Sequence, residues 1–220
     1  MRSVLRGVAG GLALLVIGDA IASRFGWAPG LVPRADGPWI WVASRSAGLV
    51  AYLALTLDVV FGLFLSTGAA DRFIARARSL ELHRWLSGVA IALAAAHGVA
   101  LAFDATVHFD ALDVLVPFIS SYRPFAVGLG IAALYALYVV RESFKWRARL
   151  GARVWRKLHM LAFAAFVMVT AHGIFAGSDT HRPWMLALYI VAVAVVAGLS
   201  AYRWSAPPVP TAGRGAPRRR

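Results

Sequence analysis

The segment LHRWLSGVAIALAAAHGVALAF, residues 82–103, is the stretch from which we predict the fold. It is largely apolar and has a histidine near each end, His83 and His97, in an H-x13-H spacing. A second apolar segment, residues 158–175, repeats the plan with His159 and His172 in an H-x12-H spacing. At about 1.5 Å of rise per residue, the two histidines of one helix lie roughly 20 Å apart. Each helix therefore offers two imidazoles at two depths.

The composition places the chain in the membrane class. Of its 220 residues 60% are hydrophobic and only 15% are charged, and the mean hydropathy is +0.68. Such values are typical of membrane proteins rather than of soluble domains. The chain has no cysteine, which excludes disulfides, thiolate metal sites and iron–sulfur clusters.

Six apolar segments are candidates for crossing a bilayer, which takes about 20 apolar residues in a helix. They are residues 4–22, 48–65, 82–103, 125–140, 158–175 and 184–202. Backbone groups in lipid must be satisfied within the segment, and no alternation with period two suggests a barrel. We therefore predict an all-α integral membrane bundle of six transmembrane helices.

The distribution of Lys and Arg predicts the orientation. Most of the 23 basic residues fall on one side: at the start, in the loops after the second and fourth spans, and in the tail. The opposite side holds Arg24, Arg34, Arg45, Arg123 and Arg182. Both termini are thus expected in the cytoplasm of a multi-pass protein of the plasma (inner) membrane. The net charge of +13 is attributed to topology and lipid contact, not to nucleic acid.

The two ends of the chain are read separately from its body. Ala20, Ile21 and Ala22 fit an A-x-A cleavage signal, so residues 1–22 are either a first helix or a removed leader. Residues 1–205 are predicted to form one transmembrane domain. Residues 206–220 are Pro-rich and basic and are expected to be disordered.

The four histidines are predicted to form two pairs. The third and fifth spans run in the same direction because one span separates them. His83 and His159 then share a depth near the cytoplasm, and His97 and His172 share one nearer the outside. Zinc takes three or four clustered ligands, which two separated pairs do not supply. A haem iron with both axial positions filled takes two facing imidazoles. Without cysteine the haems are non-covalent, so we predict two haem b groups.

The spacing of the fifth span poses a geometric difficulty. At about 100° per residue, fourteen residues return to within roughly 40° of one face, whereas thirteen end about 140° away. Either this helix has a π-bulge or kink, or the two haems lie on different sides of it. Small residues near the histidines leave room for a macrocycle or allow close helix packing: Gly88, Ala94, Ala95, Gly98, Ala164, Ala165 and Gly173.

The H-x13-H spacing begins in LHRWLSG, and the H-x12-H spacing begins in WRKLHMLAF. With these two motifs, residues 45–204 resemble the ferric reductase-like transmembrane domain. This domain is the haem core of NADPH oxidases and ferric reductases. The resemblance implies pairing of the first histidines on the cytoplasmic-side haem and of the second ones on the outer haem. It also implies electron transfer from a cytoplasmic flavin to an outside acceptor.

The electron donor and acceptor are left open. The long oxidases continue into FAD- and NADPH-binding domains, whereas no Gly-rich dinucleotide fingerprint follows a strand here. We expect a separate cytoplasmic flavin reductase, or quinol, as donor, and an unidentified extracytoplasmic acceptor. In size the chain is closer to the quinol-linked haem subunit of periplasmic methionine-sulfoxide reductase systems. That subunit, however, usually lacks a histidine corresponding to His83.

Further candidates are charged residues near the predicted haems. On the cytoplasmic side Arg84, Arg156 and Lys157 are expected either to hold haem propionates or to serve only as topology signals. On the outer side the same role is considered for Arg123 and Arg182. Asp58 is expected to accept a hydrogen bond from a neighbouring helix or to serve a proton pathway, with the structural role favoured. His108 and His181 are expected to be solvated loop residues, or else an acceptor or metal site.

A function of another class is also considered. The histidines would serve a transporter or proton channel as relay groups. Proline is absent from the middle of all six spans, which disfavours a transporter with broken helices. The leading hypothesis is a bis-haem membrane electron-transfer subunit of an oxidoreductase, without catalytic residues of its own.

Overall fold

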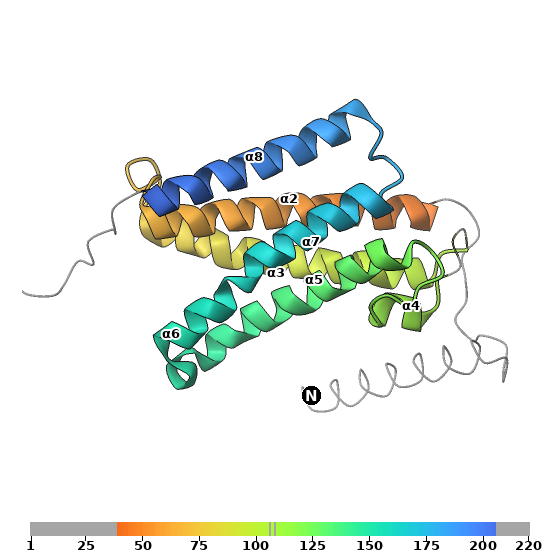
Figure 1. Cartoon of the computed structure of the whole chain (residues 1–220), viewed down its shortest axis with the longest axis horizontal. Coiled ribbons are helices and arrows are strands. Elements are labelled where there is room, and N and C mark those ends of the chain that lie inside the picture. Colours follow the sequence, from red (N-terminus) through yellow and green to blue (C-terminus); the bar gives the residue numbers. More distant parts are fainter. Residues whose placement is uncertain (1–38, 106, 108, 206–220) are drawn as a thin grey trace, which may run out of the picture.

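The computed structural model describes residues 39–205 except 106 and 108. This part of the chain is helical throughout and contains no β-strand (Figure 1). In chain order the elements are α2 (Trp39–Thr67), α3 (Arg76–Ala102), α4 (Ala111–Leu115), α5 (Pro124–Ser143), the 3₁₀ turn η1 (Phe144–Trp146), α6 (Arg147–His159), α7 (Leu161–Ala176) and α8 (Pro183–Ser205). The predicted all-α class is confirmed.

Four continuous helical runs of the described residues are long and apolar enough to cross a membrane. They are Trp39–Thr67, Arg76–Ala102, Pro124–Ala176 and Pro183–Ser205. The chain is therefore a multi-pass membrane protein. A count of six crossings is not confirmed: the first predicted span, residues 4–22, lies outside the described residues, as does the predicted disordered tail, residues 206–220.

The third of these runs doubles back on itself. α5 and α7 pack side by side, and η1 with α6 forms the turn between them (Figure 1). Gly151 in α6 has a φ of 74°, a conformation that L side chains rarely adopt, and it interrupts the helix there. Helices thus occupy both the 125–140 and the 158–175 segments, within one helical run.

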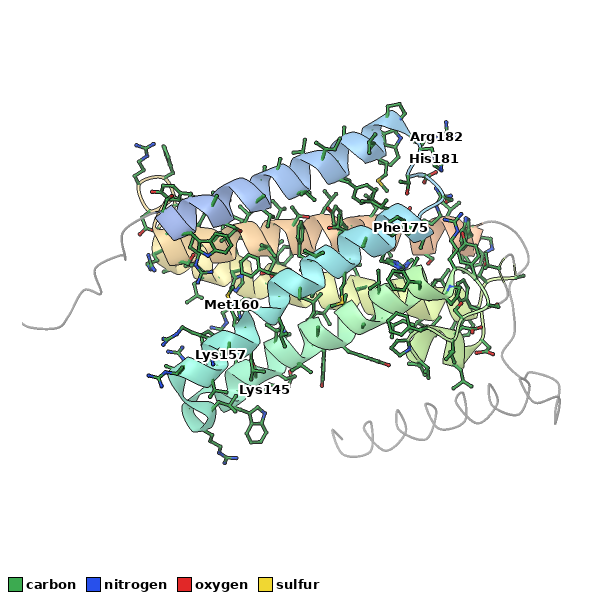
Figure 2. All side chains as sticks on the ribbon, in the orientation of Figure 1. Lys145, Lys157, Met160, Phe175, His181 and Arg182 are labelled. Atoms are coloured by element: carbon green, nitrogen blue, oxygen red, sulfur yellow. The ribbon has the colours of Figure 1, made fainter. Side chains whose placement is uncertain are left out.

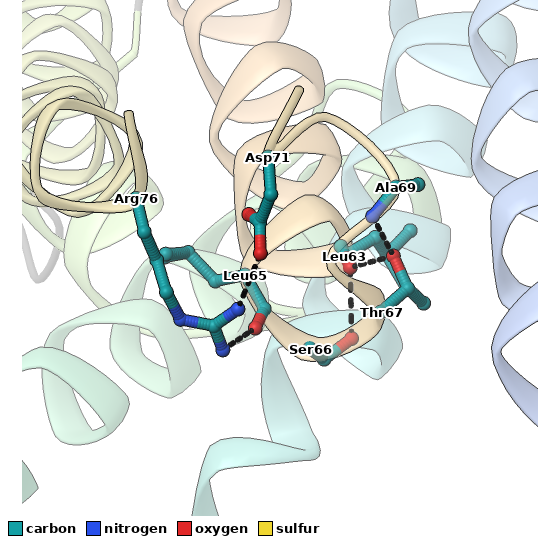
Figure 3. Close-up of polar contacts among 7 residues, drawn as sticks. All are labelled: Leu63, Leu65, Ser66, Thr67, Ala69, Asp71 and Arg76. Carbon is teal, nitrogen blue, oxygen red and sulfur yellow. Dashed lines mark hydrogen bonds and ion pairs between the residues drawn. The ribbon is translucent and has the colours of Figure 1, made fainter. Parts of the chain in front are cut away.

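The loop of residues 68–75 joins α2 to α3, which pack side by side as an antiparallel pair (Figure 1). Figure 3 shows the polar contacts at this loop. Gly68 follows the last residue of α2 with a φ of 69°, the left-handed conformation that commonly ends a helix. Arg76, at the start of α3, donates to the Leu65 carbonyl and, over 3.1 Å, to the Asp71 carboxylate. It therefore satisfies a carbonyl that the last turn of α2 leaves unpaired and places positive charge at that negative helix end.

α2 lies at the centre of the bundle, in contact with α3, α7 and α8. Tyr52 of α2 stacks on Phe166 at 6.1 Å and meets Tyr189 edge-on at 5.3 Å. The Thr170 hydroxyl donates to the Phe166 carbonyl, so it accepts the Tyr52 hydroxyl over 3.3 Å. Each hydroxyl thus has a partner in the buried interior.

Outward faces of the same helices carry apolar side chains in exposed positions. Leu57, Val99, Val167 and Ile190 are examples from α2, α3, α7 and α8. Water would disfavour so many exposed apolar side chains, whereas lipid tails do not, which agrees with a membrane location.

Candidate functional site

Two pairs of histidine rings meet inside the bundle. One pair is His97 of α3 and His172 of α7, whose ring centroids lie 6.2 Å apart with an interplanar angle of 70°. We call it the outer pair, and the end of the bundle near it the outer side, after the orientation predicted from the sequence. The inner pair is His83 of α3 and His159 at the end of α6, at 6.0 Å and 75°. These are the two pairs named from the sequence.

A break in the helix lies between His159 and His172, which belong to different pairs. Met160 separates α6 from α7, and Figure 2 shows it at this junction. Its N–H is shared between the Arg156 carbonyl at 3.1 Å and the Lys157 carbonyl at 3.2 Å, and its own carbonyl accepts from Phe163 over 3.1 Å. One bond spans four residues and two span three, a mixture of α and 3₁₀ geometry that is common at helix ends. The helix is thus interrupted between the two histidines.

Backbone carbonyls of neighbouring helices anchor three of the four rings. The Nδ1 atoms of His97, His83 and His172 lie 2.8, 3.0 and 2.8 Å from the carbonyl oxygens of Ser44, Asp58 and Ala126. A carbonyl only accepts, so each Nδ1 carries the proton and Nε2 keeps its lone pair. Imidazoles that bind metals are commonly oriented in this way.

Glycines make the space that these rings occupy. A Cβ at Gly48 would lie 3.1 Å from His97 Nδ1, one at Gly62 would lie 3.3 Å from His83 Cε1, and one at Gly130 would lie 2.8 Å from His172 Nδ1. A Cβ contact below 3.0 Å is essentially never seen, so His172 could not keep its position beside an alanine at 130. Sequence reasoning considered other small residues and missed these three.

A repeat in α2 was the signal that would have found two of them, Gly48 and Gly62. Ser44 and Gly48 are four residues apart, as are Asp58 and Gly62, and the second set follows the first by fourteen residues. The histidines of α3 have the same fourteen-residue separation in the antiparallel direction. α2 therefore presents one acceptor and one glycine to each histidine of α3.

The outer pair borders a cavity of about 480 Å³. Its lining includes His97, His172, Gly48 and Gly130, and neither inner histidine. Ligand sites of proteins commonly have volumes of about 300–1,000 Å³. Arg45 also lines the cavity, and its guanidinium pairs with the Asp179 carboxylate.

The family model described as ferric reductase-like transmembrane component matches residues 45–170. The chain belongs to this family. The match covers most of α2, all elements from α3 to α6 and most of α7, and it ends two residues before His172. No curated protein and no solved structure matches the chain. Membership supports a membrane electron-transfer role with redox partners, and the ferric reductase-like family commonly binds haem.

The residues of this ferric reductase-like chain fit axial ligation of a haem. Two imidazoles that bind one metal from opposite sides at about 2 Å per bond have ring centroids ~6 Å apart. The measured 6.2 and 6.0 Å agree with this requirement. Among the described residues no three His, Asp or Glu side chains gather as a metal-binding group. The candidate metal ligands in this part of the chain are therefore the two facing histidine pairs.

The basic residues considered for propionates occupy varied positions. On the outer side the Arg123 guanidinium donates to the Phe175 carbonyl over 2.7 Å and lies over Tyr122. Arg182 is exposed at the same end of the molecule (Figure 2). Arg45, which sequence reasoning counted only as an outer charge, is the arginine among these that lines the cavity. Contact of any of them with a propionate stays a prediction.

At the other end Arg84, Arg156 and Lys157 are exposed. The Arg84 guanidinium lies over the Phe144 ring at 5.7 Å, and the Arg84 carbonyl accepts from Arg141 over 3.2 Å. Their role beside the inner pair is likewise a prediction.

Trp155 is a neighbour of the inner pair that sequence reasoning missed. Its ring stacks on His159 with centroids 5.0 Å apart and an angle of 24°. Its buried Nε1 has no hydrogen-bond partner within the described residues. A W-x3-H spacing on one helix predicts this contact, because residues four apart share a face.

The outer acidic residues have structural partners. Asp110 caps α4 and forms a capping box with Asp113, and Asp179 pairs with Arg45. His181 is exposed, and His108 lies outside the described residues. An acceptor or metal site at these histidines stays a prediction.

Proposed function

We propose that this chain is a bis-haem b-type transmembrane cytochrome that passes electrons from a cytoplasmic donor to an extracytoplasmic acceptor. The observation that carries the proposal is the presence of two facing histidine pairs, each about the width of one bis-imidazole metal site. When bound, the two haems would supply one-electron redox centres at two depths of the membrane.

The chain's own residues would hold and orient these groups. His83 and His159 would bind one iron through Nε2, and His97 and His172 the other. Carbonyls of α2 and α5 fix the direction of three rings, so little orientation freedom is lost on binding. Apolar side chains of the bundle, such as Leu134 and Val169 in the outer cavity, would exclude water.

The proposed orientation places the inner pair toward the cytoplasm of an inner-membrane protein. Lys145 and Lys157 lie at the α6 end, and His181 and Arg182 at the opposite end (Figure 2). The α6 end carries many more Lys and Arg than the opposite end, as expected for a cytoplasmic face. Both termini are then cytoplasmic.

The proposed donor is a separate flavoprotein that docks on the basic α6 end. Arg147, Arg149, Arg153, Arg156 and Lys157 are exposed there. Such a surface attracts an acidic partner and also anionic lipid headgroups. A nicotinamide gives two electrons at once and a haem accepts one, so a flavin must stand between them.

The test is to purify the chain after haem-replete expression and to measure haem per protein by the pyridine haemochrome assay. A ratio near two with low-spin six-coordinate spectra is expected. A ratio near one would remove one pair from the proposal, and colourless protein would overturn it in favour of a histidine relay.

A further inference from the structure

The two histidines of α3 have almost the same surroundings on α2. Ser44 with Gly48 faces His97, and Asp58 with Gly62 faces His83. In both cases the backbone carbonyl of the first residue accepts from Nδ1. The difference is the side chain of that residue, a hydroxyl at the outer pair and a carboxylate at the inner pair.

The Asp58 carboxylate lies against the inner ring. Its Oδ1 is 2.7 Å from His83 Nδ1, and the Asp58 carbonyl oxygen is 3.0 Å from the same atom. The single hydrogen on His83 Nδ1 is aligned with the Asp58 carbonyl. Asp58 Oδ1 has no hydrogen-bond donor of its own in the described part of the chain, so it can only share this hydrogen. Asp58 is only 7% exposed, so water screens its charge poorly.

At the outer pair the corresponding group is neutral. The Ser44 hydroxyl lies 2.9 Å from His97 Nδ1 and donates to the His97 carbonyl over 2.9 Å. Ser44 is fully buried. The pair of sites therefore amounts to a natural comparison of a carboxylate with a hydroxyl behind the same kind of ligand.

We propose that Asp58 holds the midpoint potential of the inner haem site below that of the outer site, so that electrons run outward with a loss of free energy. This inference rests on the function proposed above. It assigns Asp58 as a positioning and tuning residue that acts through His83.

The sign follows from elementary electrostatics. A carboxylate beside Nδ1–H makes the imidazole a stronger electron donor, and second-shell groups of this kind tune metal sites. A more basic ligand and a nearby buried negative charge both favour the oxidised iron, which carries one more positive charge. The oxidised form is favoured, so the midpoint potential falls. One electron moves between the sites in this step, and no bond or proton changes place.

The experiment is a spectroelectrochemical titration of purified, haem-loaded full-length chain. Asp58→Asn keeps the size and an acceptor oxygen but removes the charge. The lower midpoint potential is expected to rise, so that the difference between the two midpoint potentials becomes smaller. The haem content is expected to stay unchanged. Electron paramagnetic resonance should show a change in the g-values of one low-spin component only.

Ser44→Asp is the mirror variant, and it tests the same effect without altering Asp58. It should lower the midpoint of the outer component, while Ser44→Ala identifies that component with a smaller shift. If Asp58→Asn fails to fold, the Ser44→Asp result decides. Midpoints that do not respond to either charge change, or that move the opposite way, would overturn the inference alone. Absence of haem in the unsubstituted protein would overturn the proposed function as well.

Discussion

The outer and inner histidine pairs use the same bundle but differ in how their second ring is held. In the outer pair His172 donates to the Ala126 carbonyl and lies against Gly130, so α5 determines its direction. In the inner pair His159 lies directly before the helix break at Met160, and its ring stacks on Trp155. α2 anchors the first ring of both pairs. Neighbouring helices thus position both rings of the outer pair, whereas a local helix break lies beside the second ring of the inner pair.

Removing a ring is the strongest way to test this comparison. His97→Ala and His172→Ala should abolish the outer spectral component, and His83→Ala and His159→Ala the inner one, each lowering haem content from about two to about one per chain. Each loss should also lower thermal stability, because a ligand bound only by the folded state stabilises it. Visible spectra and the haemochrome assay measure both. Loss of the same component in His83→Ala and His172→Ala would contradict the pairing.

Alanine at the glycine positions should weaken haem binding at one site at a time, with smaller effects than the removal of a histidine. Gly130→Ala, whose Cβ would lie 2.8 Å from His172, should weaken the outer site by about 1–3 kcal/mol, roughly 5- to 150-fold in haem affinity. Gly62→Ala, at 3.3 Å from His83, should have a smaller effect on the inner site. Rates of haem transfer to an acceptor apoprotein provide the measurement.

Gly198→Ala, in α8, is the matched control for these variants, because its Cβ would meet nothing within 4 Å and Gly198 does not line the cavity. The haem affinity of this variant should equal that of the unsubstituted chain. An equal loss at Gly198 and Gly130 would show that helix content, rather than the ring contact, determines the outcome.

The Trp155 contact should matter only to the inner pair. Trp155→Leu removes the stack on His159 and should weaken inner haem retention by about 0.5–1.5 kcal/mol, whereas Trp155→Phe should retain most of it. Trp146→Leu, on an exposed indole of η1, is the control. The two components are followed separately by low-temperature spectra. A change in the outer component with an intact inner one would rule out this role.

Donor docking is expected to give the smallest, salt-dependent effect. NADPH alone should reduce neither component of the chain in liposomes, and an acidic flavin reductase on the α6 side should reduce the inner one first. Substituting Arg147, Arg149 and Arg153 by Gln should slow this severalfold at low salt, and less above physiological ionic strength, where the Debye length falls below ~8 Å.

Arg182→Gln, at the opposite end, is the control for docking and should leave the rate unchanged. Reduction by NADPH without any reductase would contradict the need for a partner, and equal rates in low and high salt would assign the basic residues to lipid contact.

The sequence by itself determined the membrane class, the helices and the two histidine spacings. Hydropathy and the distance between His83 and His97 are properties of short segments, so they survive without knowledge of neighbours. They were enough to place helices over the 48–65 and 82–103 segments, while the number of crossings depended on residues outside the described part. The family resemblance also rests on such local spacing.

Only the tertiary structure decided which partner each ring has. The contacts of Asp58 and Ser44 with His83 and His97 depend on how α2 and α3 are rotated about their axes and shifted along each other. Hydropathy leaves this rotation open, because lipid accepts almost any apolar face that packing does not use. The break between α6 and α7 at Met160 likewise has no proline or glycine at that position to predict it. The chemistry of the two sites therefore follows from helix registry, which no single segment contains.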